Sequence, residues 1–157
     1  MKRKLGLAGL ALALGLFVAA CGGGGGGGGD RLSKADYLAK VQAVGAEMNK
    51  TLSGLGSTSS DPKLAAEQFG KLKVALKAAA DELAALKPPA EVDSAHKQFA
   101  EGISLLADEI GKASTVMAGG DLKAALEFVT NLAKSPAMAK VQAAVAEFKK
   151  AGYDVSK

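Results

Sequence analysis

Hydrophobic residues recur at alternating steps of three and four along most of the chain beyond residue 33. This spacing places them on one face of an α-helix. A first helix is predicted over about 34–53, where Ser33 and Asp36 have the spacing of a capping box with Asp in place of Glu. Its apolar stripe consists of Tyr37, Val41, Val44, Met48, Leu52 and Leu55.

The middle of the chain predicts two long helices that Pro88-Pro89 separates. Asp61-Pro62 is typical of a helix start, with an N-cap followed by proline at the first helical position. Gly119-Gly120 ends the second of these helices. The two stripes repeat as in a bundle seam. Their members are Ala65, Phe69, Leu72, Leu76, Ala79, Leu83 and Leu86, then Val92, Phe99, Ile103, Leu106, Ile110, Ala113 and Met117.

The last segment, 121–151, predicts a fourth arm that is broken or kinked at Pro136. Asp121 is a suitable cap, and Ser135-Pro136 is a second pair of cap and proline. The long helices should measure about 40–44 Å, so a helix after Pro136 alone covers only half of that length. Gly152 is the expected C-cap. The apolar positions of this arm are Leu122, Leu126, Val129, Met138, Val141, Val145 and Phe148.

Together these segments predict an all-α domain over residues 33–157, an antiparallel up-down-up-down four-helix bundle. Tight loops make neighbouring helices antiparallel, and no strand-like alternation of useful length occurs. Alanine fills many seam and flanking positions. We therefore expect helices that approach closely but bury little area per residue, with the leucine stripes compensating.

Two segments of different composition precede the helices. Lys2-Arg3-Lys4 leads into an uncharged apolar run over residues 5–20, which is short for a membrane-spanning helix and typical of a cleaved export signal. An uncleaved N-terminal anchor is the alternative. Residues 22–29 are eight consecutive glycines, which predict a flexible tether with a reach of roughly 16 Å. A repeat expansion without tuned length would have the same physical behaviour.

Val18-Ala19-Ala20-Cys21 resembles the lipobox of bacterial lipoproteins. In that family the cysteine thiol carries a diacylglyceryl group, and the chain is cut before the cysteine. The resemblance implies a signal peptide at 1–20, a lipidated Cys21 with its tether through residue 32, and a location on the extracytoplasmic face of the cell membrane. Two acyl chains anchor a protein stably, whereas one binds only marginally. A stray cysteine near an ordinary secretory cleavage site is the alternative.

The whole layout resembles small helical lipoproteins of actinobacteria, a group without an established activity. The resemblance rests on the entry at 33–37, the interhelical Leu86-Lys87-Pro88-Pro89-Ala90 and the ending at 148–153. Many such proteins carry a cysteine in the first helix and another near the C-terminus. Here Gly45 and residues 154–156 occupy the comparable places, which implies that no disulfide forms.

Charge and composition change this picture little. The 157 residues include 20 basic and 16 acidic ones, but three of the basic residues lie in the leader. The remaining 17 basic against 16 acidic residues say nothing about partners, although the pI is near 9.1. With 4% aromatic residues and no Trp, the chain does not resemble a nucleic-acid platform. A single cysteine excludes an internal disulfide and a Cys-rich zinc site.

His96 is the only imidazole and lies three residues after Asp93. Two ligands are too few for a metal, and the Glu-x-x-His pairs of di-iron bundles are incomplete. Haem ligation by His96 with a methionine is conceivable, but methionine at helical spacing is usually core filler. We therefore expect a partly exposed histidine in weak contact with Asp93, and neither a metal nor a cofactor. The methionines considered are Met48, Met117 and Met138.

No catalytic residues are predicted, because the chain has neither a Gly-x-Ser-x-Gly elbow nor a phosphate-binding glycine loop. The predicted function is a non-enzymatic, membrane-anchored binding module of the cell envelope, attached through Cys21. Its partner is an unknown envelope protein or a small ligand, and not a nucleic acid. The alternative is a carrier or sensor of a small apolar ligand or lipid held within the bundle.

Overall fold

The computed structural model describes residues 31–54 and 61–155, without the side chains of Leu122, Ala125, Leu126 and Val129. The predicted leader, Cys21, the glycine tract and Leu55 lie outside this part of the chain. All regular structure in the described ranges is helical, which confirms the predicted all-α class. The elements are α1 (Lys34–Gly54), α2 (Pro62–Ala85), the 3₁₀ turn η1 (Ala90–Val92), α3 (Asp93–Ala118), α4 (Leu122–Leu132) and α5 (Pro136–Lys150).

Side-chain caps hold the helix starts where the sequence predicted them. Ser33 accepts a hydrogen bond from the amide of Asp36 at 3.2 Å and donates its hydroxyl to that carboxylate at 2.7 Å. Asp61, Asp121 and Ser135 accept hydrogen bonds from backbone amides two or three residues further on, at 2.8, 2.9 and 3.2 Å. These bonds satisfy amides that have no partner within the helix.

The predicted break in the fourth arm is confirmed, because α4 ends at Leu132 and α5 begins at Pro136. The start of α3 differs from the prediction. After Pro88-Pro89 the chain first forms η1, closed by a 3.1 Å bond from the amide of Val92 to the carbonyl of Pro89, and α3 begins only at Asp93.

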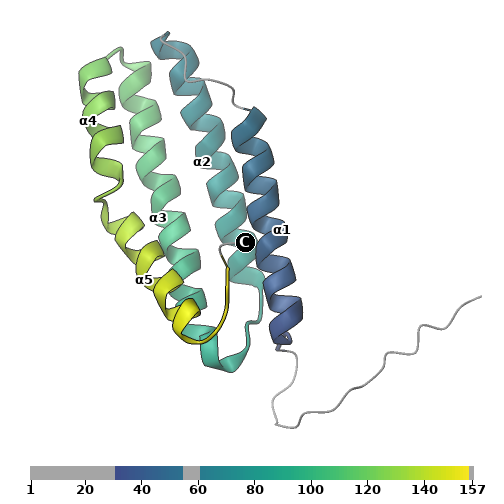
Figure 1. Ribbon diagram of the computed structural model, residues 1–157. Helices are drawn as coiled ribbons and strands as arrows, with labels where there is room; N and C mark the ends of the chain where they lie inside the picture. Colours follow the sequence, from purple (N-terminus) through teal and green to yellow (C-terminus); the bar gives the residue numbers. More distant parts are fainter. Residues whose placement is uncertain (1–30, 55–60, 156–157) are drawn as a thin grey trace, which may run out of the picture.

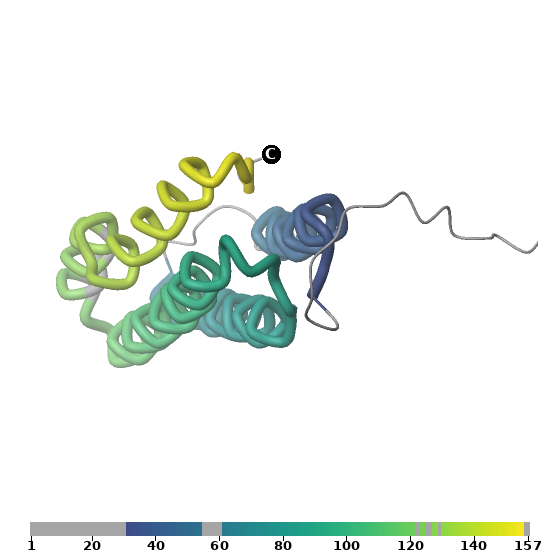
Figure 2. The backbone as a smooth tube through the Cα atoms, turned by 90° about the horizontal axis from the view of Figure 1, so that it is seen from below, coloured from purple at the N-terminus to yellow at the C-terminus, as the bar shows by residue number. Residues whose placement is uncertain are grey.

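The helices stand side by side in the order α1, α2, α3 and then the arm formed by α4 and α5 (Figure 1). The α2–α3 contact is the most extensive, followed by those of α5 with α3 and of α1 with α2. Seen from below, α1 and α5 lie on the same side of the α2–α3 pair, and the C-terminal segment lies between them (Figure 2). Tyr37 of α1 bridges this side through ring contacts with Phe148 and Tyr153.

The predicted stripes of α2 and α3 form the core. Leu76, Leu83 and Ile110 are buried, and Tyr37 and Phe148 complete this cluster from α1 and α5. The α1 stripe leaves the core at its end, since Leu52 is 42% exposed. This end of α1 therefore adds little burial.

The buried face of α5 differs from the prediction at two positions, while the predicted Val141 and Phe148 do pack into the core. Ala137 and Ala144 are completely buried, whereas the expected Met138 and Val145 are only half-buried. The reason is a close approach to α3 at Gly102, where an added Cβ would lie 2.8 Å from Cγ2 of Val141. Alanine at 137 and 144 fits this separation, whereas larger side chains at these two positions would not.

Candidate functional site: a groove between α2 and α3

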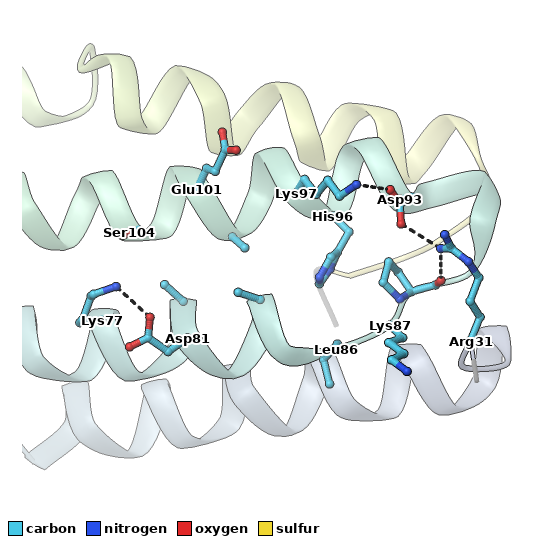
Figure 3. A pocket seen from close by; sticks show the side chains of 14 residues that line it. Arg31, Lys77, Asp81, Leu86, Lys87, Asp93, His96, Lys97, Glu101 and Ser104 are labelled. Atoms are coloured by element: carbon cyan, nitrogen blue, oxygen red, sulfur yellow. Dashed lines mark hydrogen bonds and ion pairs between the residues drawn. The ribbon is translucent and has the colours of Figure 1, made fainter. Parts of the chain in front are cut away.

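A groove of about 590 Å³ runs between α2 and α3 (Figure 3). We call it the α2–α3 groove; it is bounded by α2 from Lys77 onward with the following loop, by α3 from Asp93 to Ser104, and by Arg31. Alanines at facing positions of the two helices leave this space, since they fill little of it. The volume lies within the range of roughly 300–1,000 Å³ that small-molecule sites occupy. The apolar lining is formed by Ala80, Ala84, Leu86, Pro88 and Ala100.

One end of the groove carries two cations on a single carboxylate. Arg31 binds Oδ1 of Asp93 at 2.8 Å, and Nζ of Lys97 lies 2.7 Å from Oδ2 (Figure 3). The hydrogen bonds from Lys97 and Arg31 lower the pKa of the Asp93 carboxyl to about 2. The three groups therefore keep a net positive charge at neutral pH.

The other two carboxylates of the groove, Asp81 and Glu101, are each paired with a lysine. Nζ of Lys77 lies 2.8 Å from Oδ1 of Asp81, one turn further along α2. Glu101 pairs with Lys140 of α5 at 2.5 Å. Each of these pairs is neutral in sum. The excess positive charge of the paired groups is thus concentrated near Arg31 and Lys97.

Arg31 reaches this position because the segment before α1 lies against the loop between α2 and η1. The Arg31 guanidinium also donates to the carbonyl of Pro88 at 2.9 Å. The amide of Leu32 donates to the carbonyl of Lys87 at 2.9 Å. The positive end of the groove is therefore where the N-terminal segment joins the helices.

The prediction of a partly exposed His96 in weak contact with Asp93 is wrong. The side chain is only 3% exposed, and Nδ1 lies 3.0 Å from the phenol oxygen of Tyr37. Asp93 instead pairs with Arg31 and Lys97. His96 projects from α3 towards α2 at the wall of the groove (Figure 3). In the sequence, His96 continues the apolar series Val92, Phe99 and Ile103 at steps of four, three and four, which agrees with this position at the edge of the seam.

Nε2 of His96 is buried and has no hydrogen-bond partner among the described residues. Burial, and then Tyr153, raise the pKa of the Tyr37 phenol, so Tyr37 keeps its proton. With Tyr37 assigned as the donor to Nδ1, the ring proton resides on Nε2. His96 then presents a buried N–H group without an acceptor, an arrangement that is costly in a protein interior.

The pKa of His96 is lowered, chiefly by burial and further by the charge of Lys97. Asp93 and the backbone of Leu83 act in the opposite direction. The backbone of Leu83 lies close enough to the ring to favour its protonated form, but it does not reach the geometry of a hydrogen bond with Nε2. The imidazole is therefore neutral at neutral pH.

An aromatic cluster packs against His96. Tyr37 contacts the imidazole edge-on at 5.6 Å between ring centroids and also contacts Tyr153. The Tyr153 hydroxyl donates to Glu91 at 2.5 Å, and burial with this bond raises the pKa of Tyr153 to about 12. The C-cap of α5 is Ala151, and the predicted Gly152 follows it at φ 77°, where it turns the chain so that the amide of Tyr153 reaches the carbonyl of Phe148.

Sequence reasoning missed Arg31 and Tyr153 as parts of this end of the molecule. No local signal marks Arg31, because its partners Pro88 and Asp93 lie 57 and 62 residues away. Tyr37 was assigned to the core stripe, but its bond to His96 depends on how α1 meets α3.

For two of the three candidate methionines, helix geometry argues against haem ligation together with His96. Met117 packs with Ala65 and Ala66 in a separate cluster, and 21 residues of helix, about 31 Å, separate it from His96. Met48 packs against the core, 11 residues beyond Tyr37 on α1. This spacing corresponds to about 16 Å of helix, and Tyr37 is the α1 residue that contacts His96. Within the described ranges, no three His, Cys, Asp or Glu side chains gather as a metal site would need.

Comparison of the chain with protein-family models, with curated proteins and with solved structures finds no match. Among the described helices, none combines the length and the apolar character that crossing a membrane requires.

Proposed function

We propose that this protein is a lipid-anchored, extracytoplasmic binding module of the cell membrane and that it has no catalytic activity. Cys21 is the attachment point in this proposal. The support is the resemblance of Val18-Ala19-Ala20-Cys21 to a lipobox, together with the charged start and the apolar run before it. The remaining chain has nearly balanced charge, so in this proposal the attached lipid, and not a basic surface, holds the protein at the membrane.

The scaffold in this proposal is an up-down-up-down antiparallel bundle of four arms, with α4 and α5 as one arm. Short connections between α2 and α3 and between α3 and α4 support it, because such loops join antiparallel neighbours. The packing of α3 against α2, α4 and α5 agrees with this order. In such a bundle α2 and α3 are the long supports on which a surface site is rigidly held.

The α2–α3 groove is the recognition site in this proposal, and its construction is the observation that carries the function. An apolar floor lies beside an ion-paired rim and a buried N–H group without an acceptor. Cys21 and Arg31 are ten positions apart in the sequence, so the chain between them can span at most about 36 Å. The positive end of the groove would thus remain close to the bilayer.

A carrier of a small apolar ligand is the second candidate. The described interior holds the rings of Tyr37, Phe148 and Tyr153, and the α2–α3 groove lies between two helices rather than at the centre of the bundle. The groove favours a small molecule or a narrow group as its occupant, because its volume matches such sites. A ligand carrier would therefore use the same groove.

The anchor is tested with Cys21→Ala in the native host. We expect the variant to lose the lipid mass and to leave the membrane fraction; unchanged mass and membrane retention contradict the anchor. The groove is tested separately with a photo-crosslinking residue at position 84 and, as the matched control, at the exposed Ala46 of α1. An adduct of one defined mass at position 84 alone is expected, and equal labelling at both positions contradicts the groove.

A further inference from the structure

Hydrogen-bond donors outnumber acceptors at the positive end of the α2–α3 groove. Arg31 and Lys97 carry donors only, and Nε2 of His96 is assigned as a third donor without a partner. The ionised group that they share is Asp93, whose two oxygens already bind the two cations. The chemistry that this end lacks is an acceptor with negative charge.

The neighbouring part of the groove has the opposite character. Ala80, Ala84 and Ala100 form an apolar floor without polar side-chain atoms. The charges beyond it, Lys77 and Asp81, neutralise each other at 2.8 Å. A ligand that spans both parts therefore needs an anionic head and an apolar body.

We propose that the α2–α3 groove binds an acidic amphiphile whose carboxylate or phosphate lies among Arg31, Lys97 and His96 and whose apolar part covers Ala80, Ala84 and Ala100. This inference rests on the proposed role of the groove as the binding site, and it is independent of the lipid on Cys21. Nε2 is covered by its neighbours, so the ligand oxygen meets it once side chains at the groove wall shift.

The sign of the ligand charge follows from the fixed donors. A cationic head would lie beside Arg31 and Lys97, and the carboxylate between these two cations is already paired on both oxygens. A neutral alcohol accepts one hydrogen bond without charge assistance. A hydrogen bond between a donor and an ionised acceptor is roughly twice as strong, so these donors favour an anion. The anion has two sources, the headgroup of an acidic membrane lipid or a free amphiphile.

The experiment uses the full chain in phosphatidylcholine nanodiscs, selectively labelled with ¹⁵N-histidine and purified without a polyhistidine tag. Because His96 is the only histidine, its imidazole gives an unambiguous NMR reporter. Hexanoate, hexyl phosphate and hexanol are titrated in parallel. Ligands with six carbons are used because such short chains do not form micelles during the titration. We expect both anions to move the Nε2 resonance with saturation and hexanol at equal concentration to leave it in place.

Charge variants identify the contacts. Arg31→Gln and Lys97→Gln should each weaken hexanoate binding about fivefold, because each removes one charge-assisted bond at a partly exposed rim. Lys112→Gln, an exposed lysine of α3 outside the groove, should leave binding unchanged. Equal shifts with hexanol and hexanoate, or undiminished affinity in both rim variants, would overturn the inference.

Nanodiscs that contain phosphatidylglycerol distinguish the two sources. A shifted Nε2 resonance that hexanoate no longer changes identifies the lipid headgroup. An unshifted resonance that hexanoate still moves identifies a free amphiphile, and both results support the site. If the Nε2 resonance responds neither to the two anions nor to phosphatidylglycerol, the proposed site is overturned. The lipid anchor is tested independently, by the mass and membrane fractionation of Cys21→Ala.

Discussion

Tyr37 and His96 form a buried hydrogen bond of 3.0 Å that joins α1 to α3. Tyr37 is completely buried, and His96 is the buried polar residue of the described core. The bond connects the aromatic cluster to the wall of the α2–α3 groove. With Tyr37 assigned as the donor, the imidazole proton resides on Nε2, so the stability of the fold and the chemistry of the groove depend on the same pair.

Tyr37→Phe should lower the free energy of unfolding by about 1–3 kcal/mol, because it leaves Nδ1 of His96 buried without a partner. Urea unfolding followed by circular dichroism measures this loss. Tyr153→Phe is the matched control, since its hydroxyl bonds to the exposed Glu91, where water replaces the lost partner. An equal or smaller loss for Tyr37→Phe than for Tyr153→Phe contradicts the structural role of the Tyr37–His96 bond.

Acidification below about pH 6.5 should destabilise the protein through His96. The pKa of the folded imidazole is lowered by burial, so the unfolded chain binds this proton at higher pH than the folded chain. The free energy of unfolding is therefore constant above about pH 6.5 and falls as the pH drops through the folded pKa.

Unfolding measured from pH 7.5 to 5.5 tests this pH dependence, because ordinary carboxyl groups stay ionised in that range. The pKa of Asp93, about 2, lies far below it. In His96→Gln the slope between pH 6.5 and 5.5 should disappear even if the variant is less stable throughout. A slope that persists in His96→Gln assigns the pH dependence to another group.

Local chemistry predicted most of the fold. Asp61 and Ser135 as caps, and Gly152 after the end of α5, depend only on the few residues around them. The buried face of α5 did not follow in the same way, because an apolar stripe is wide enough for both Ala137 and Met138. The choice between them depends on Gly102, 35 residues earlier, where α3 lets α5 approach closely.

The groove was less predictable than the helices. Its floor needs Ala80 and Ala84 of one helix to face Ala100 of another, and periodicity does not show which outer faces oppose each other. Arg31 precedes the first helix and acquires its place only through partners on the α2–η1 loop and α3. His96 was located near the seam by spacing, but its burial depends on Tyr37 of a different helix.

Gly102→Ala should lower the free energy of unfolding by about 1–3 kcal/mol through overpacking. The new Cβ would lie 2.8 Å from Cγ2 of Val141 and 3.1 Å from its backbone nitrogen, so α5 must move away. Gly45→Ala is the matched control, since an added Cβ there meets nothing within 4 Å in a helix. It should stabilise the protein by about 0.5–1 kcal/mol. Thermal unfolding of both variants should thus give shifts of opposite sign, and two upward shifts contradict the close approach of α3 and α5.

Ala84→Phe should block the α2–α3 groove without unfolding the protein. Ala84 is an exposed residue of α2 that lines the groove, so a phenyl ring there enters the space above the floor while the core stays unchanged. We expect the affinity for hexanoate in phosphatidylcholine nanodiscs to fall at least about tenfold, and the free energy of unfolding to remain within about 0.5 kcal/mol of the parent. Ala46→Phe, on an exposed position of α1 outside the groove, should leave the affinity unchanged. If Ala84→Phe binds hexanoate as the parent does, the ligand lies elsewhere on the molecule. A loss in both variants assigns the effect to added surface hydrophobicity rather than to the groove.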